Sequence, residues 1–268
     1  MTRKLLLSIL PTLLLLPATA EQDDRADGTF KEIISADPDV HPNLKKMIKE
    51  RLAKYPKDYK AKLVFGKFQQ EDYLYSIAIL DAEEKYDGLE EFWRPWSWAV
   101  IRSVEWKNGA KNGIEKVFKD GKVESEILWK NGKVHGTRKS FHSNGKLRSE
   151  TIWVNGLANG PSRSYDATGR LQREANMKNG KRDGLLTYYW LGTDTPKRII
   201  NYKMGKVDGP VEEFYTNGKI KREMNFKNDE MHGKESEYDL NGKVVRLQFW
   251  FGGDKVSRKE LKLKLKSR

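Results

Sequence analysis

Hydrophobic and polar positions in the second half of the chain repeat with a period of about 24 residues. An apolar residue opens each unit, and successive openings are 23, 24, 24, 25, 24 and 24 residues apart. Self-similarity at a fixed short period is typical of architectures in which each repeat is one supersecondary element. The opening residues are Trp106, Trp129, Trp153, Met177, Tyr202, Phe226 and Trp250.

Two further positions recur in every complete unit. A glycine follows seven residues after the opening residue, and an aromatic residue follows five residues later. The glycines are Gly113, Gly136, Gly160, Gly184, Gly209 and Gly233, and the aromatic residues are Phe118, Phe141, Tyr165, Tyr189, Phe214 and Tyr238. We interpret all these rows as structural, forming a packed spine rather than a platform for a cofactor or a glycan.

The pattern within a unit predicts a β-hairpin. Alternation over residues 220–226 places Ile220, Met224 and Phe226 on one face of a strand. Asn144-Gly145 has the sequence of a two-residue hairpin turn in which both central residues take positive φ, as do Asn217-Gly218 and Asn241-Gly242. A lone hairpin is marginally stable in water, so neighbouring units are expected to join edge to edge. The predicted fold is mainly β, an elongated antiparallel sheet of tandem hairpins.

Residues 21–80 are predicted to form a small α+β cap with one helix. The helix is expected over 43–53, with Asn43 as its N-cap. Its apolar residues, at i, i+3, i+4 and i+8, are Leu44, Met47, Ile48 and Leu52. Strands are expected over 63–68 and 73–80. The repeat array then runs over 81–258, beginning with a degenerate copy around Tyr86-Asp87-Gly88.

The last ten residues, 259–268, contain an alternation of leucine and lysine over 261–266. This pattern predicts a final edge strand or a basic tail, whose lysines would discourage further strand pairing. The same cations could contact a polyanion. The residues concerned are Lys259, Lys262, Lys264, Lys266 and Arg268.

The first twenty residues have the organisation of a secretory signal peptide. Arg3 and Lys4 precede an apolar run over 5–16, and Ala18-Thr19-Ala20 supplies small residues for cleavage after Ala20. The run is shorter than the 20 or so residues of a membrane-spanning helix. We therefore expect an exported product, periplasmic or secreted. The chain contains no cysteine, which excludes disulfides and cysteine-based metal sites.

The net charge of +13 is unevenly distributed. Residues 106–268 carry 35 Lys and Arg against 20 Asp and Glu, whereas residues 21–105 carry 14 against 18. A basic surface can attract anionic lipid or polysaccharide. Alternatively, the lysines only keep the sheet soluble and its edges apart, which is the interpretation we favour. Nucleic acid is not expected as a partner.

The side chains that could take part in catalysis or metal binding recur with the period of the repeat and do not cluster into one site. His135 and His232 precede the recurring glycine, where other units carry Asn or Asp, which indicates turn chemistry rather than metal binding. Glutamates also recur with the repeat, at Glu126, Glu150, Glu174 and Glu223. Cross-strand ion pairs explain them more simply than a pair of hydrolase carboxylates. Nucleophile-elbow and phosphate-loop motifs are absent from the sequence. The chain is predicted to be neither an enzyme nor a cofactor-binding protein.

The stretch 141–160 carries the motif most completely, with Phe141, Asn144-Gly145-Lys146, Glu150, Trp153 and Gly160. This spacing resembles the MORN repeat, and is closest to the bacterial variant found in proteins labelled as antitoxin components. The resemblance covers about 81–258 and implies a repeat fold used for spacing, scaffolding and binding. Our leading expectation is an exported protein-interaction or scaffolding module of the cell envelope. The alternatives are an electrostatic binder of anionic lipid or polysaccharide, and an antitoxin-like partner of another protein.

Overall fold

The structure, a computed structural model, describes residues 31–35, 42–68, 71–94 and 99–266. The predicted signal peptide, 1–20, lies outside the described residues. The chain divides into two compact units. The first comprises Met1–Lys122 with Trp129–Gly132, and the second comprises Val123–Leu128 with Lys133–Arg268.

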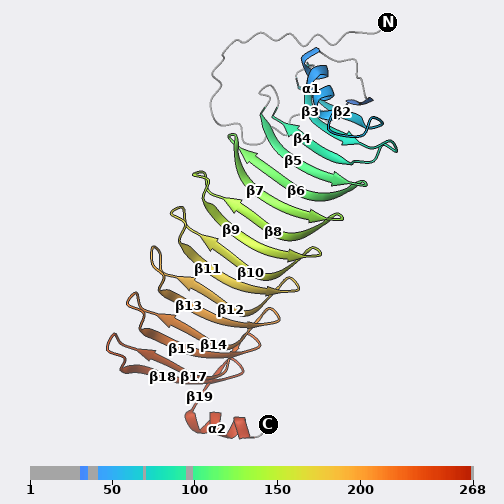
Figure 1. Ribbon diagram of the computed structural model, residues 1–268. Helices are drawn as coiled ribbons and strands as arrows, with labels where there is room; N and C mark the ends of the chain where they lie inside the picture. The colour runs from blue at the N-terminus through green and yellow to red at the C-terminus, as the bar shows by residue number, and fades with distance from the viewer. Residues whose placement is uncertain (1–30, 36–41, 69–70, 95–98, 267–268) are drawn as a thin grey trace. The chain divides into compact units, whose positions relative to one another are not determined.

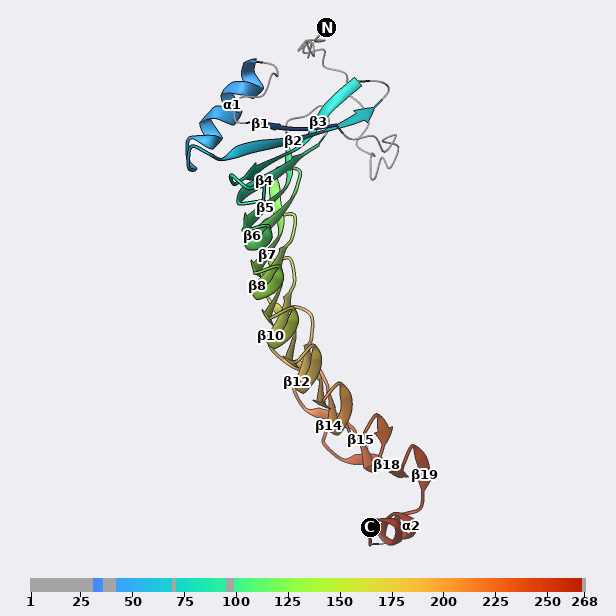
Figure 2. The same cartoon turned by 90° about the vertical axis from the view of Figure 1, so that its right-hand side faces the viewer.

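The first unit contains one helix and six strands among its described residues. They are β1 (Lys31–Ser35), α1 (Pro42–Leu52), β2 (Lys60–Phe68), β3 (Glu71–Leu80), β4 (Gly88–Trp93), β5 (Val100–Lys107) and β6 (Ala110–Lys119). Each strand pairs antiparallel with the next along the chain. α1 lies beside the first strands (Figure 2). The sequence did not predict β1, which pairs with β2 over five residues.

The helix α1 covers a small core of this unit. Leu44 and Ile48 are buried with Leu63 and Ile77, and Met47 packs against them. The helix begins at Pro42, so the expectation that Asn43 precedes it as N-cap is wrong. Proline suits the first helical position because its φ is already helical and no N–H is needed there.

The second unit consists mainly of antiparallel hairpins. Its elements are β8 (Lys133–Phe141), β9 (Leu147–Val154), β10 (Leu157–Tyr165), β11 (Leu171–Lys178), β12 (Lys181–Tyr189), β13 (Pro196–Lys203), β14 (Lys206–Phe214), β15 (Ile220–Lys227), β16 (Glu230–Met231), β17 (Gly233–Tyr238), β18 (Val244–Phe251), β19 (Asp254–Val256) and α2 (Arg258–Lys266). β7 (Lys122–Lys130) contributes residues to both units. In the second unit the hairpins follow one another in chain order (Figure 1). The predicted mainly β fold of antiparallel hairpins is confirmed.

Two kinds of turn alternate along the array. At Asn131-Gly132, φ is 49° and 74°, the conformation of a tight hairpin turn with two left-handed residues. The prediction of that turn at Asn144-Gly145 is wrong, because only the glycine has positive φ. The side chain of Asn144 instead accepts a hydrogen bond from the Lys146 N–H at 3.0 Å and closes a longer turn. Asn217 and Asn241 likewise lack positive φ.

The recurring glycine marks a bend within a strand. At Gly160, φ is 127°, and residues 159–161 of β10 together oppose Ile152 of β9. A Cβ on this glycine would lie 3.3 Å from the Cβ of Ile152. The geometry is that of a β-bulge that needs glycine. The other recurring glycines, Gly113, Gly136, Gly184, Gly209 and Gly233, share the positive φ.

The C-terminal segment is a helix, so the expected final strand over 259–268 is wrong. Ser257 Oγ accepts from the Glu260 N–H at 3.2 Å, and Glu260 Oε2 accepts from the Ser257 N–H at 2.7 Å. This capping box starts α2 and outweighs the alternating pattern. Leu261 is buried, whereas Leu263 is 60% exposed. Among the described residues, neither helix is long and apolar enough to cross a membrane.

Candidate binding groove on the repeat sheet

A continuous row of buried side chains crosses strands β11 to β15. The five residues are Ala175, Leu186, Ile200, Val211 and Met224, each opposite the next across adjacent strands. We call the side of the sheet that carries them the core face, and the other side the opposite face. Of this row, the alternation of the sequence predicted only Met224 as a member of one strand face. The signal for the whole row was present, because each member stands two residues before an opening residue or two residues after a recurring glycine.

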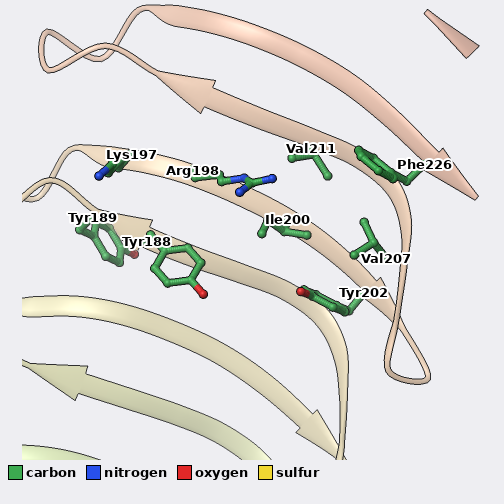
Figure 3. Close-up of a pocket in the computed structure, with 9 residues that line it drawn as sticks. All are labelled: Tyr188, Tyr189, Lys197, Arg198, Ile200, Tyr202, Val207, Val211 and Phe226. Atoms are coloured by element: carbon green, nitrogen blue, oxygen red, sulfur yellow. The ribbon is translucent and has the colours of Figure 1, made fainter. Parts of the chain in front are cut away.

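An open groove of about 580 Å³ lies on the core face over β12 to β15 (Figure 3). Ile200 and Val211 belong to its apolar floor. Tyr188, Tyr202 and Phe226 are half-buried and add aromatic surface along it. The groove therefore offers apolar and aromatic area that stays accessible to a ligand.

Cations stand along the groove but are already engaged within the protein. Arg198 Nε lies 3.6 Å from Glu213 Oε1. Lys197 Nζ lies 4.8 Å from the centre of the Trp190 ring, a cation–π contact. Burial is the largest effect on Tyr189, which also lines the groove, and it raises the pKa of that phenol. The groove thus combines an apolar floor with cations that already have partners within the protein.

The three rows predicted from the sequence occupy regular places in the hairpins. The opening residues Trp106, Trp129, Trp153, Tyr202, Phe226 and Trp250 are all half-buried, as are the aromatic residues Phe118, Phe141, Tyr165, Tyr189, Phe214 and Tyr238. Of these twelve, Tyr189, Tyr202 and Phe226 line the groove. The structure thus brings only one stretch of the predicted spine to the candidate site.

The recurring glutamates Glu150, Glu174 and Glu223 lie on the opposite face, and part of the row is ion-paired. Arg163 lies between Glu150 and Glu174, with nitrogen–oxygen distances of 3.7 Å and 2.8 Å. The expected ion pair is wrong for Glu223, which stands directly across from Glu212. Tyr238 Oη donates to Glu223 Oε2 at 2.6 Å, which stabilises that carboxylate without neutralising it.

The repeat histidines stand directly before the recurring glycines, His135 within β8 and His232 between β16 and β17. His135 Nδ1 lies 3.5 Å from the backbone nitrogen of Asn155, in the turn between β9 and β10, and the His232 ring is tilted by 42° against Phe251 with centroids 4.8 Å apart. Over the part of the chain that the structure describes, no three His, Cys, Asp or Glu side chains form a group suited to a metal ion.

The predicted polyanion contacts lie on α2, apart from Arg268, which is outside the described residues. Lys259, Lys262, Lys264 and Lys266 are exposed, and Lys264 Nζ lies 5.0 Å from the centre of the Phe251 ring. On the helix, Lys259, Lys262 and Lys266 are spaced i, i+3 and i+7 and therefore share one face, whereas Lys264 lies off that face.

Comparison with known sequences defines the class of repeat. The sequence model of the MORN repeat variant matches residues 134–155, 158–179, 207–228 and 231–250. The chain therefore carries MORN repeats over these residues, and such repeats suggest a repeat protein that binds other molecules or membranes. The match concerns the repeat itself and does not test the expected antitoxin role.

Further comparisons add no argument about function. No curated protein matches this chain. A solved structure of an S. aureus TarM mutant, in complex with fondaparinux, alpha-GlcNAc-glycerol and UDP, is 18% identical. The match covers 36% of this chain and 19% of that chain, with a TM-score of 0.27. Similarity at that level supports no conclusion about the fold or the ligand.

Proposed function

We propose that the chain is an exported, non-enzymatic protein-interaction module of the cell envelope. The groove on the core face is its binding site, and its ligand is a segment of a partner protein. The open apolar groove over β12 to β15 carries this proposal, because its floor and aromatic walls lie on regular strands.

The lining of the groove favours a protein segment over a charged ligand. Tyrosine and other aromatic residues dominate the affinity of protein interfaces because they bury a large area with little loss of conformational freedom. Tyr188 and Phe226 provide such area on either side of Ile200. Since Arg198 is paired with Glu213, it can set the orientation of a partner more than it adds to the affinity.

Export and the lack of catalysis rest on separate observations. The charged start, apolar run and small residues within 1–20 support export. The carboxylates Glu150 and Glu174 are held by Arg163, which makes them poor candidates for acid–base chemistry.

Affinity capture with groove variants tests the proposal. The immobilised full chain is exposed to an envelope extract of its host and washed at low and then high salt. We expect one protein to survive the high-salt wash on the wild type and on Leu185→Ala, a change on the exposed opposite face. The groove variants Tyr188→Ala and Phe226→Ala should lose it.

Two results would contradict the proposal. Retention that is equal on the groove variants and the wild type would place the interface elsewhere. Recovery of polyanionic material alone, released by salt, would instead favour binding through the basic charge of the repeats.

A further inference from the structure

The last hairpin supplies a hydrogen-bond acceptor for the indole of the half-buried Trp250. Trp250 Nε1 donates to Glu235 Oε2 at 2.6 Å, and Arg222 Nε donates to Glu235 Oε1 at 2.9 Å. Glu235 is 1% exposed and stands two residues after the recurring glycine. One buried carboxylate thus satisfies an indole and a guanidinium on the core face.

Two middle repeats each keep one of these donors, Trp153 or Arg173, but lack the carboxylate. Arg138 stands two residues after its recurring glycine, the place that Glu235 has in the last hairpin. Trp153 Nε1, in the strand that follows, is buried and makes no hydrogen bond to any described residue. Arg173 Nε is likewise buried without a partner among the described residues. Buried donors without acceptors are uncommon in folded proteins and point to a missing group.

Hydroxyl groups fill the surface between these donors. Arg138 stands opposite Thr151, which stands opposite Ser162. Thr151 Oγ1 and Ser162 Oγ are 2.8 Å apart and share one hydrogen bond. Because each hydroxyl both donates and accepts, the pair can make further hydrogen bonds to a ligand. We call Arg138, Trp153, Thr151, Ser162 and Arg173 the donor patch.

No acidic side chain of β8 to β11 completes the donor patch. The acidic residues of β8 to β11 are Glu150 and Glu174. Both lie on the opposite face, where they pair with Arg163. The acceptor must therefore come from outside these strands.

We propose that the donor patch binds the carboxylate groups of an acidic polysaccharide. A carboxylate placed between Arg138 and Trp153 takes the role that Glu235 has in the last hairpin. Arg138 and Arg173 are three strands apart, a backbone separation of about 14 Å. One compact anion cannot satisfy both, whereas a linear chain with repeated carboxylates can. Sugar hydroxyls between those groups would meet Thr151 and Ser162.

Titration calorimetry of the full chain with a polygalacturonate oligomer tests this site. We expect binding by the wild type, and none to neutral dextran. Arg138→Glu should weaken binding at least tenfold and also raise the melting temperature, because the new carboxylate gives Trp153 an internal acceptor. Trp153→Phe, which removes the N–H and keeps a ring, should weaken binding several-fold. Circular dichroism checks that each variant is folded.

Two controls separate this site from bulk charge and from the groove. Arg148→Glu makes the same charge change on an exposed arginine outside the donor patch, and should leave affinity within about threefold at 0.15 M salt. Phe226→Ala, a groove variant, should leave polygalacturonate binding unchanged. The two proposals can therefore fail independently.

Several outcomes would overturn the proposal. They are absence of polygalacturonate binding, an equal loss in Arg138→Glu and Arg148→Glu, or a lower melting temperature in Arg138→Glu. Tighter binding of poly-glutamate would assign the patch to acidic peptides. Tighter binding of phosphatidylglycerol vesicles would assign it to a membrane surface.

Discussion

Truncation of Leu186 to alanine should destabilise the second unit by about 3 kcal/mol. Leu186 is 1% exposed and lies between Ala175 and Ile200 in the buried row. Removing three carbons costs about 2.4 kcal/mol at ~0.8 kcal/mol each. The void left behind adds to this cost, because strands on either side hold the neighbouring side chains in place.

The adjacent leucine provides a matched control. Leu185 is 56% exposed, so Leu185→Ala should cost less than about 0.5 kcal/mol. Urea unfolding followed by circular dichroism measures both variants, and hydrogen exchange tests whether protection falls first around β12. Equal destabilisation by the two substitutions would refute the assignment of the core face.

Three further predictions follow from individual contacts. Glu212→Arg should stabilise the chain by about 0.5–1 kcal/mol in urea unfolding, because it replaces the repulsion of Glu223 by a cross-strand ion pair; a loss of stability would contradict this. Gly136→Ala should lower the free energy of unfolding by about 1–3 kcal/mol because φ is 93° and the new Cβ meets a leucine methyl group. At Gly145 the new Cβ would have open space, so Gly145→Ala should lower the free energy of unfolding by less in the same assay. Burial raises the pKa of Glu90 above its ordinary value of 4.5, so the folded state favours the protonated carboxyl group. The contribution of Glu90 to the free energy of unfolding is therefore complete below pH 4.5 and is lost as the pH rises through the raised pKa. Melting temperatures measured from pH 4 to 7 should decline less in Glu90→Gln than in the wild type.

The repeat could be read from the sequence because its signals are local. The period and the positions of aromatic residues and glycines depend only on spacing, and the hairpins follow from them. The candidate groove could not be derived in the same way. Which face buries Leu186 rather than Leu185 depends on the bulge at the recurring glycine, which breaks the simple alternation of the strand.

Two of the errors share a cause, since each involved competition between a local side-chain hydrogen bond and a residue pattern. Asn144 uses its side chain to close a longer turn, so its backbone does not need positive φ. At the C-terminus, the reciprocal bonds of Ser257 and Glu260 start a helix where alternation favours a strand. The unpaired indole of Trp153 was also invisible to periodicity, because the loss of its acceptor appears only when hairpins are compared in three dimensions.

The pairing of each hairpin with its chain neighbours has a consequence for how the protein is made. In the second unit, the described strands find their partners within one or two hairpins along the sequence. Contacts of such short sequence separation carry a small loop-closure cost, which is unusual for a β protein. A nascent chain can therefore complete each hairpin soon after it leaves the ribosome, without waiting for a distant strand. Loss or duplication of a whole 24-residue unit would leave the register of the remaining hairpins intact.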